Sequence, residues 1–177
     1  MERWWNLGHF QREKILYEAL MSRGVKTSFV TYGDDSDKRF EKDFARGIKI
    51  FPFASFRLRK NVLSKFLHSL LLPLSMSSVI KESDVLKTNQ MWGSWVTLLA
   101  GLIFSKPVIA RSGYEAYRNL EISGGFSLYR IALYCTSWLT YHFADLVWLN
   151  SGSIKDYVVK KFHIDEKKII GKNIIMR

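Results

Sequence analysis

Residues 83–115 read SDVLKTNQMWGSWVTLLAGLIFSKPVIARSGYE. Two short apolar runs in this stretch, 84–88 and 107–111, have the aliphatic and β-branched composition of buried strands. The mostly apolar residues 92–104 between them have the length of a helix. A strand, a helix and a second strand form the repeating unit of a parallel sheet, so this stretch predicts an α/β fold.

The same alternation continues on both sides of the stretch. Toward the amino terminus it predicts a helix, a strand, a polar helix and a strand, in that order, at 10–22, 25–31, 37–45 and 48–51. Toward the carboxyl terminus it predicts a helix, a strand, a helix and a strand at 126–143, 145–150, 153–162 and 168–170. In the first helix we expect one apolar face, formed by Ile15, Leu16, Ala19 and Leu20. Together these elements predict a Rossmann-like parallel sheet with helices on both faces.

One strand of this pattern is missing. A doubly wound sheet normally opens with a central strand that leads into the first helix. Only residues 1–7 precede the helix here, and they do not have the composition of a buried strand. We therefore expect a single domain, residues 1–177, without its first strand and with both ends cut.

The composition indicates a globular domain with an anionic partner. Of the 177 residues, 47% are hydrophobic and 15% aromatic, which is enough to form a core. The net charge of +11 favours nucleic acid, acidic lipid or a phosphorylated substrate as partner, without choosing among them. A single cysteine, Cys135, excludes an internal disulfide and fits a cytoplasmic protein, and its apolar neighbours predict a buried thiol.

The ends of the strands carry the candidate binding residues. Ligands of open parallel sheets bind beyond the carboxyl ends of the strands. There we expect ligand contacts from Asn89, Gln90, Trp92, Arg111, Tyr114 and Glu115, and from Gly8 and His9 before the first helix; the family resemblance described below implies that the first six lie on the acceptor side. Two alternatives stay open: Asn89 as a helix N-cap, and Arg111 paired internally with Glu115. The scattered histidines and the lone cysteine have no metal-ligand spacing, so no metal is predicted.

Residues 56–72 form a basic and apolar segment. Arg57, Arg59, Lys60 and Lys65 alternate with large apolar side chains. This mixture suits the surface of an anionic membrane. A core helix with a solvated basic face explains the segment equally well. The best candidate for a membrane span, residues 91–104, is too short to cross a bilayer.

Three runs of the chain resemble a known family. They are NLGHFQREKILYEALMSRGVKTSFVTYGD, the 83–115 stretch, and ADLVWLNSGSIKDYVVKKFHIDEKKIIGKNII. They resemble the amino-terminal, acceptor-binding domain of retaining GT-B glycosyltransferases of the glycosyltransferase family 4-like type. The sequence departs from the family at Gly113-Tyr114, where a histidine is frequent, and at Lys172-Asn173, where the family has Pro-Asn.

The resemblance implies half of a hexosyltransferase for polysaccharide biosynthesis. The complete enzyme would move a sugar from a nucleotide-sugar, its co-substrate, to a glycan or lipid-linked acceptor at the cytosolic membrane face, with no other cofactor. Gly8 and His9 would lie near the donor. The family's donor-binding domain and its Glu-x7-Glu motif do not occur in this sequence, so the chain alone is expected to be inactive and no catalytic residue is assigned.

Two readings from other classes remain. One is a non-catalytic basic module that binds nucleic acid or another anionic polymer. No RNP, zinc-finger or helix-turn-helix pattern occurs, so nucleic acid is not the expected partner. The other is a scaffold whose partner chain supplies the donor half.

Overall fold

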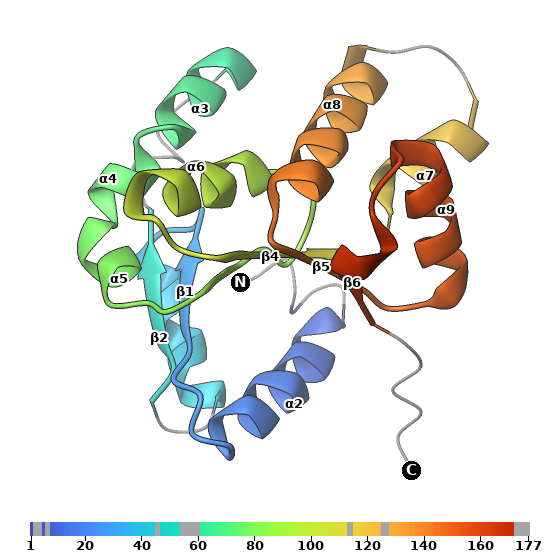
Figure 1. The fold of residues 1–177 in the computed structure, drawn as a ribbon. Coiled ribbons are helices and arrows are strands. Elements are labelled where there is room, and N and C mark those ends of the chain that lie inside the picture. Colours follow the sequence, from blue (N-terminus) through green and yellow to red (C-terminus); the bar gives the residue numbers. More distant parts are fainter. Residues whose placement is uncertain are drawn as a thin grey trace. The chain divides into compact units, whose positions relative to one another are not determined.

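The computed structural model describes residues 1, 5, 8–44, 47–53, 61–112, 115–124 and 128–171. They form two compact units, residues 1–72 and 73–177 (Figure 1). Each unit has its own parallel sheet and its own cluster of buried apolar side chains.

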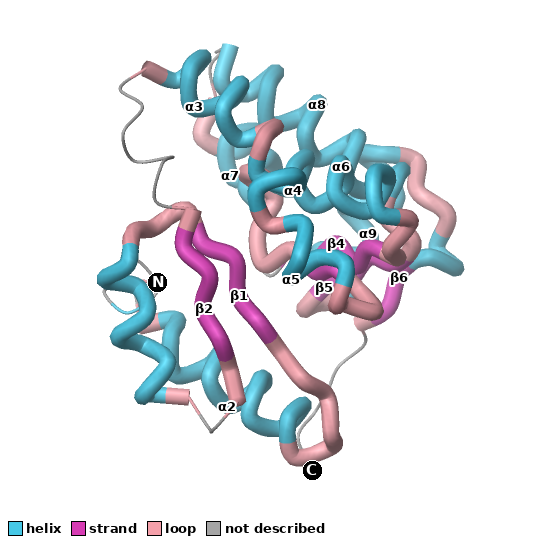
Figure 2. Tube along the Cα trace, turned by 90° about the vertical axis from the view of Figure 1, so that its left-hand side faces the viewer, coloured by secondary structure: helices cyan, strands magenta, loops and turns pink. Residues whose placement is uncertain are grey.

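The first unit contains two parallel strands with helices. Its elements are α2 (His9–Met21), β1 (Ser28–Thr31), the 3-10 helix η1 (Asp35–Asp43), β2 (Lys49–Pro52) and α3 (Val62–Ser69), and α4 (Leu72–Ser75) begins at its last residue. Strands β1 and β2 lie side by side, with Ser28 opposite Lys49 and Thr31 opposite Pro52 (Figure 2). Both strands and the first helix were predicted within three residues. The polar helix predicted at 37–45 is present as a 3-10 helix. Asp34 is its N-cap, and the Asp34 carboxylate accepts from the Ser36 N–H at 3.0 Å.

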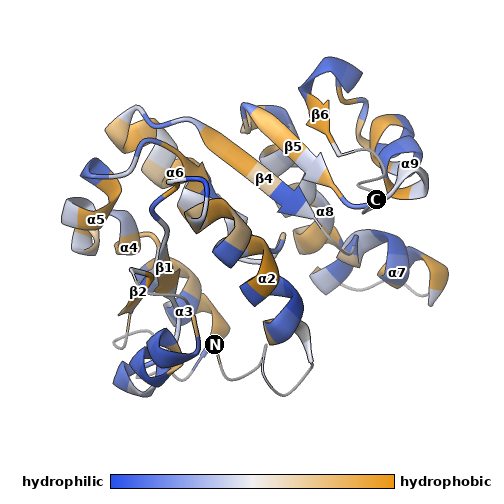
Figure 3. Cartoon of the chain, turned by 90° about the horizontal axis from the view of Figure 1, so that it is seen from below, coloured by the Kyte–Doolittle hydropathy of each residue, from blue (hydrophilic) through white to orange (hydrophobic). Residues whose placement is uncertain are grey.

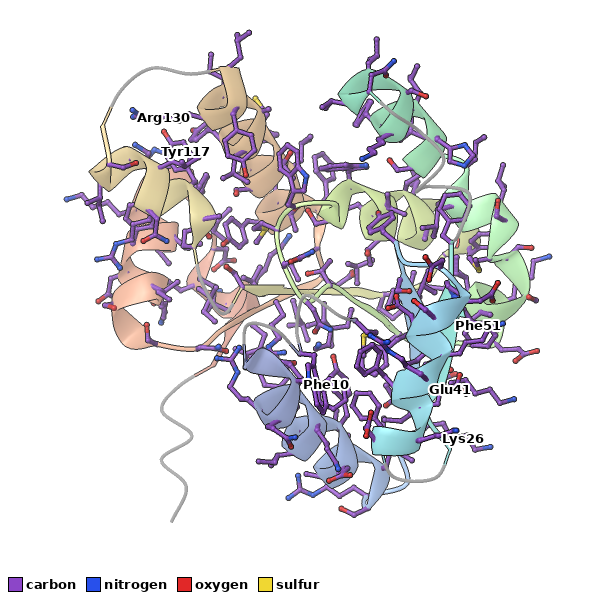
Figure 4. The ribbon with its side chains drawn as sticks, turned by 180° about the vertical axis from the view of Figure 1, so that it is seen from behind. Phe10, Lys26, Glu41, Phe51, Tyr117 and Arg130 are labelled. Carbon is purple, nitrogen blue, oxygen red and sulfur yellow. The ribbon has the colours of Figure 1, made fainter. Side chains whose placement is uncertain are left out.

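Aromatic side chains fill the core of this unit. The Tyr17 and Phe29 rings meet edge to face with centroids 4.6 Å apart, and Phe10 lies 5.0 Å from Phe44 (Phe10 is labelled in Figure 4). Edge-to-face contacts of this kind add to the stability gained from burial. The predicted apolar face of α2 was wrong in part: Ile15 is 62% exposed, because the buried positions follow the spacing of Phe10, Glu13 and Tyr17.

The second unit contains a four-stranded parallel sheet. Its elements are α5 (Ser77–Lys81), β3 (Leu86–Lys87), α6 (Ser94–Phe104), β4 (Val108–Ser112), α7 (Ala116–Ile122), α8 (Leu128–Phe143), β5 (Leu146–Leu149), α9 (Gly152–Phe162), η3 (Glu166–Lys168) and β6 (Ile169–Ile170). The strand order is β3-β4-β5-β6. In Figure 1, α6 and α8 lie on the same side of β4 and β5. The hydroxyl groups of Ser94 on α6 and Thr140 on α8 are hydrogen-bonded to each other.

One face of this sheet forms the core with the helices. Ala110 on β4 and Val147 and Leu149 on β5 are fully buried, in one cluster with Leu133 of α8 and Phe162 of α9. The predicted α/β class is therefore confirmed: the strands are parallel, and helices flank them. The described strands form two sheets instead of one.

The prediction for Cys135 was wrong. Its thiol is exposed, because the buried positions of α8 are Leu133, Ser137, Thr140 and Tyr141, which lie on one helix face that excludes position 135. Within the described ranges, no helix is long and apolar enough to cross a membrane.

Candidate functional site

The carboxyl ends of β3, β4 and β5 bring basic and aromatic side chains to one face of the sheet. Arg111 on β4 lies opposite Trp148 on β5, and Lys87 on β3 lies opposite Ile109. Since alternate residues of a strand share a face, Lys87, Arg111 and Trp148 project from the same face. Figure 3 shows β4 changing from hydrophobic to hydrophilic along its length.

Four side chains meet at this point, and we call them the strand-end cluster: Lys87, Asn89, Arg111 and Trp148. The Asn89 side-chain oxygen accepts from the Lys87 ammonium and, at 3.4 Å, from the Arg111 guanidinium. The guanidinium carbon lies 5.4 Å from the centroid of the Trp148 ring, and the Lys87 nitrogen lies 5.9 Å from it. Both distances fall within the range of cation–π attraction. Two positive groups therefore share one amide oxygen and one indole ring.

The backbone beneath the cluster is held by Thr88. Its hydroxyl oxygen accepts from the Arg111 backbone N–H at 3.0 Å, and its own N–H donates to the Ile109 carbonyl at 3.0 Å. Thr88 and Arg111 are buried, whereas Lys87, Asn89 and Trp148 are half-buried. A buried strand end thus supports a partly open polar cluster, as a binding site requires.

Glu115 occupies a different position from the one expected for an acceptor contact. It is 2% exposed. Its carboxylate accepts from the Tyr141 hydroxyl, from the Ser112 hydroxyl at 3.4 Å and from the Tyr117 N–H at 3.3 Å, where it caps α7. Burial raises the pKa of Glu115, while these hydrogen bonds act in the opposite direction. The geometry gives Glu115 a structural role inside the unit.

The other predicted acceptor contacts are spread around the strand ends. Trp92 is 41% exposed and packs on Trp95 and Tyr129, with ring centroids 5.4 and 5.2 Å away. Gln90 is exposed in the bend before α6. Tyr114 lies outside the described residues. Of the six predicted acceptor residues, the structure brings Asn89 and Arg111 into direct contact.

The remaining predicted residues belong to the first unit. Gly8 has a positive φ of 69° and precedes α2, which begins at His9. Arg57, Arg59 and Lys60 lie outside the described residues, and Lys65 lies on α3. The alternative role of Asn89 as a helix N-cap does not match the structure, because Gly93 occupies the N-cap position of α6.

Sequence reasoning missed Lys87 and Trp148. Both lie within strands. An alternating sequence pattern indicates which face of the sheet a residue lies on, but it does not indicate which residue of the next strand lies opposite. Trp148 lies beside Arg111 because of the register between β4 and β5. Among the described residues, no group of three or more histidine, cysteine or acidic side chains could hold a metal ion.

No protein-family model and no curated protein matches this chain. The chemistry of the strand-end cluster is therefore the main indication of function.

Proposed function

We propose that this chain is the acceptor-binding half of a GT-B glycosyltransferase of the family 4-like type. The observation that carries the proposal is the meeting of Lys87 and Arg111 at Asn89 and Trp148, at the carboxyl ends of parallel strands. This is the edge where α/β sheets bind their ligands. The parallel α/β fold is in keeping with the family resemblance of the sequence.

The cluster has the chemistry for a phosphorylated glycan acceptor. A guanidinium and an ammonium pair with phosphate oxygens, and arginine does so in a fork that lysine cannot copy. The indole ring of Trp148 is apolar and π-rich, and the residue is half-buried. Asn89 supplies an amide that donates and accepts hydrogen bonds, as sugar hydroxyl groups require. A pyrophosphate-linked sugar fits these three features.

The proposal includes a cytoplasmic protein at the inner face of a membrane. Its support is α3, whose side chains Val62, Leu63, Phe66 and Leu67 are between 43% and 78% exposed. Exposed apolar side chains beside basic ones are typical of a helix that lies on an anionic membrane surface. A lipid-linked acceptor would be reached from that surface.

The test is acceptor binding by the purified chain. Isothermal titration calorimetry would compare a short-chain prenyl-pyrophosphoryl sugar with the same sugar lacking the pyrophosphate. We expect the first compound to bind more tightly, and Arg111→Lys to weaken its binding about tenfold, since a charge-assisted fork is lost. The matched control is Lys155→Gln, which changes a charged side chain that pairs with Glu166 at 2.7 Å.

The melting temperature of each variant shows whether the fold is intact. Equal binding by a well-folded Arg111→Lys variant and by the wild type would remove the cluster from the acceptor site. Tighter binding of a mixed-sequence oligonucleotide than of the pyrophosphoryl sugar would favour a basic module for anionic polymers.

A further inference from the structure

A second candidate site lies among the helices of the 73–177 unit. Residues of α7, α8 and α9 line a cavity of about 750 Å³, which is within the range of small-molecule sites. Its walls include three tyrosines and three basic side chains, namely Tyr117, Tyr134, Tyr157, Arg130, Lys160 and Lys161. Figure 4 labels Tyr117 and Arg130 beside each other. None of these residues belongs to the strand-end cluster.

The charge of this cavity favours an anion. Two of the lining basic groups, Lys161 and Arg130, contact the carboxylate of Glu121, which accepts from the Lys161 ammonium and from the Tyr157 hydroxyl at 2.7 Å. The Arg130 guanidinium lies 4.0 Å from the same carboxylate. The hydrogen bond from Lys161, followed by that from Tyr157, lowers the pKa of Glu121, so this carboxylate stays ionised and holds Lys161 in place. The described residues that line the cavity include these three basic side chains and no carboxylate, so the lining is positively charged.

The rings of the cavity favour a flat ligand. Lys161 lies 5.4 Å and Arg130 lies 5.8 Å from the centroid of the Tyr117 ring, and the Tyr134 ring lies 5.1 Å from Tyr117. Aromatic walls of this kind pack against another flat ring in stacked or edge-to-face contact. Cations beside those walls can pair with an anionic group attached to that ring.

We infer that this cavity binds a small anionic ligand with a flat ring, of the chemical class of a nucleoside monophosphate. The phosphate pairs with Arg130, Lys160 and Lys161, and the base packs against the tyrosine rings. The inference does not depend on glycosyl transfer, because it uses neither the strand-end cluster nor an acceptor.

Calorimetric titration of the full chain tests the inference with three probes: adenosine 5′-monophosphate, adenosine and inorganic phosphate. We expect the monophosphate to bind at one site, at least about tenfold more tightly than either fragment, because only it uses both the rings and the charges. Arg130→Gln and Lys160→Gln should each weaken its binding, Arg130→Gln by about tenfold.

The matched control is Lys26→Gln, which removes one positive charge from an exposed position in the other unit. It should leave the affinity unchanged. Lys160 is exposed, so its variant remains informative if Arg130→Gln fails to fold. Absence of monophosphate binding at millimolar concentration would overturn the inference. Equal losses for Arg130→Gln and Lys26→Gln would also overturn it.

Discussion

Glu115 illustrates how a single residue can hold several elements together. Its backbone follows β4, its carboxylate caps α7, and the same carboxylate accepts from Tyr141 on α8. Burial raises the pKa of Glu115 and also raises that of Tyr141, where the charge of Glu115 adds to the effect. A buried carboxyl group whose pKa is raised in the folded state couples stability to pH.

The sign of this coupling predicts the behaviour of Glu115→Gln. The pKa of Glu115 is higher in the folded protein than in the unfolded chain. The contribution of Glu115 to the free energy of unfolding is therefore fully present below the ordinary carboxyl pKa, and it is lost as the pH rises through the folded-state pKa. Glutamine cannot ionise, so the variant should gain stability relative to the wild type between acid and neutral pH. Urea unfolding across that pH range measures the difference.

Tyr141→Phe is the matched variant for the same site. It removes one hydroxyl donor from a buried carboxylate and should destabilise the protein by about 1 to 3 kcal/mol.

The pH dependence also has an outcome that would contradict it. If the difference in the free energy of unfolding between the wild type and Glu115→Gln does not change with pH, the burial of Glu115 does not control its ionisation in solution.

At the scale of elements, the contact between α6 and β4 depends on a glycine. A Cβ added at Gly101 would collide with the Val108 side chain and would lie 2.9 Å from the Lys106 carbonyl oxygen. The backbone N–H of Lys106 also donates to the Gly101 carbonyl at 2.9 Å, so the chain turns back tightly from the helix into the strand. Only a residue without a side chain allows this approach.

Gly101→Ala should therefore lower stability by about 1 to 3 kcal/mol through overpacking. The control is Gly152→Ala in the first turn of α9, where no atom lies within 4 Å of an added Cβ. That variant should be neutral or stabilising by up to about 1 kcal/mol, because alanine loses less backbone entropy on folding. Thermal unfolding of both proteins gives the comparison, and similar melting temperatures would contradict the close packing of α6 on β4.

The elements also explain how far the sequence could predict the fold. Strand β4 and helix α6 were predicted within two residues, because each is an apolar run of suitable length with a polar or glycine boundary. Helix α7 was not predicted, since seven residues are too few to show a clear helical period and the burial of α7 depends on tertiary contacts of Tyr117. The exposed Cys135 was missed because its sequence neighbours are apolar, whereas helical spacing decides which side chains face the core.

The site was predicted only in part, for a similar reason. Asn89 and Arg111 were found because polar residues at strand ends stand out from the apolar runs before them. Their partners Lys87 and Trp148 required the strand register, and the cavity formed by α7, α8 and α9 required the packing of three helices. Neither the register nor the packing has a local pattern in the sequence.

At the scale of the whole molecule, the net charge of +11 and the exposed side chains of α3 predict binding to anionic membranes. Sedimentation with vesicles that contain phosphatidylserine should show binding that falls as salt is raised from 0.1 to 1 M, because the screening length shrinks from about 10 Å to about 3 Å. Vesicles of phosphatidylcholine alone should bind less protein.

The double variant Leu63→Ser, Phe66→Ser tests whether α3 makes this contact. Both side chains are exposed, so the change should leave the melting temperature nearly unaltered, while vesicle binding should fall about tenfold or more as apolar contacts are lost. The control is Leu102→Ser, Ile103→Ser on α6, where the two side chains are also exposed. Because α6 has no basic residue, these changes should weaken vesicle binding much less. Equal losses for the two double variants would show that exposed apolar surface in general drives adsorption, and α3 would then have no special place in the proposed function.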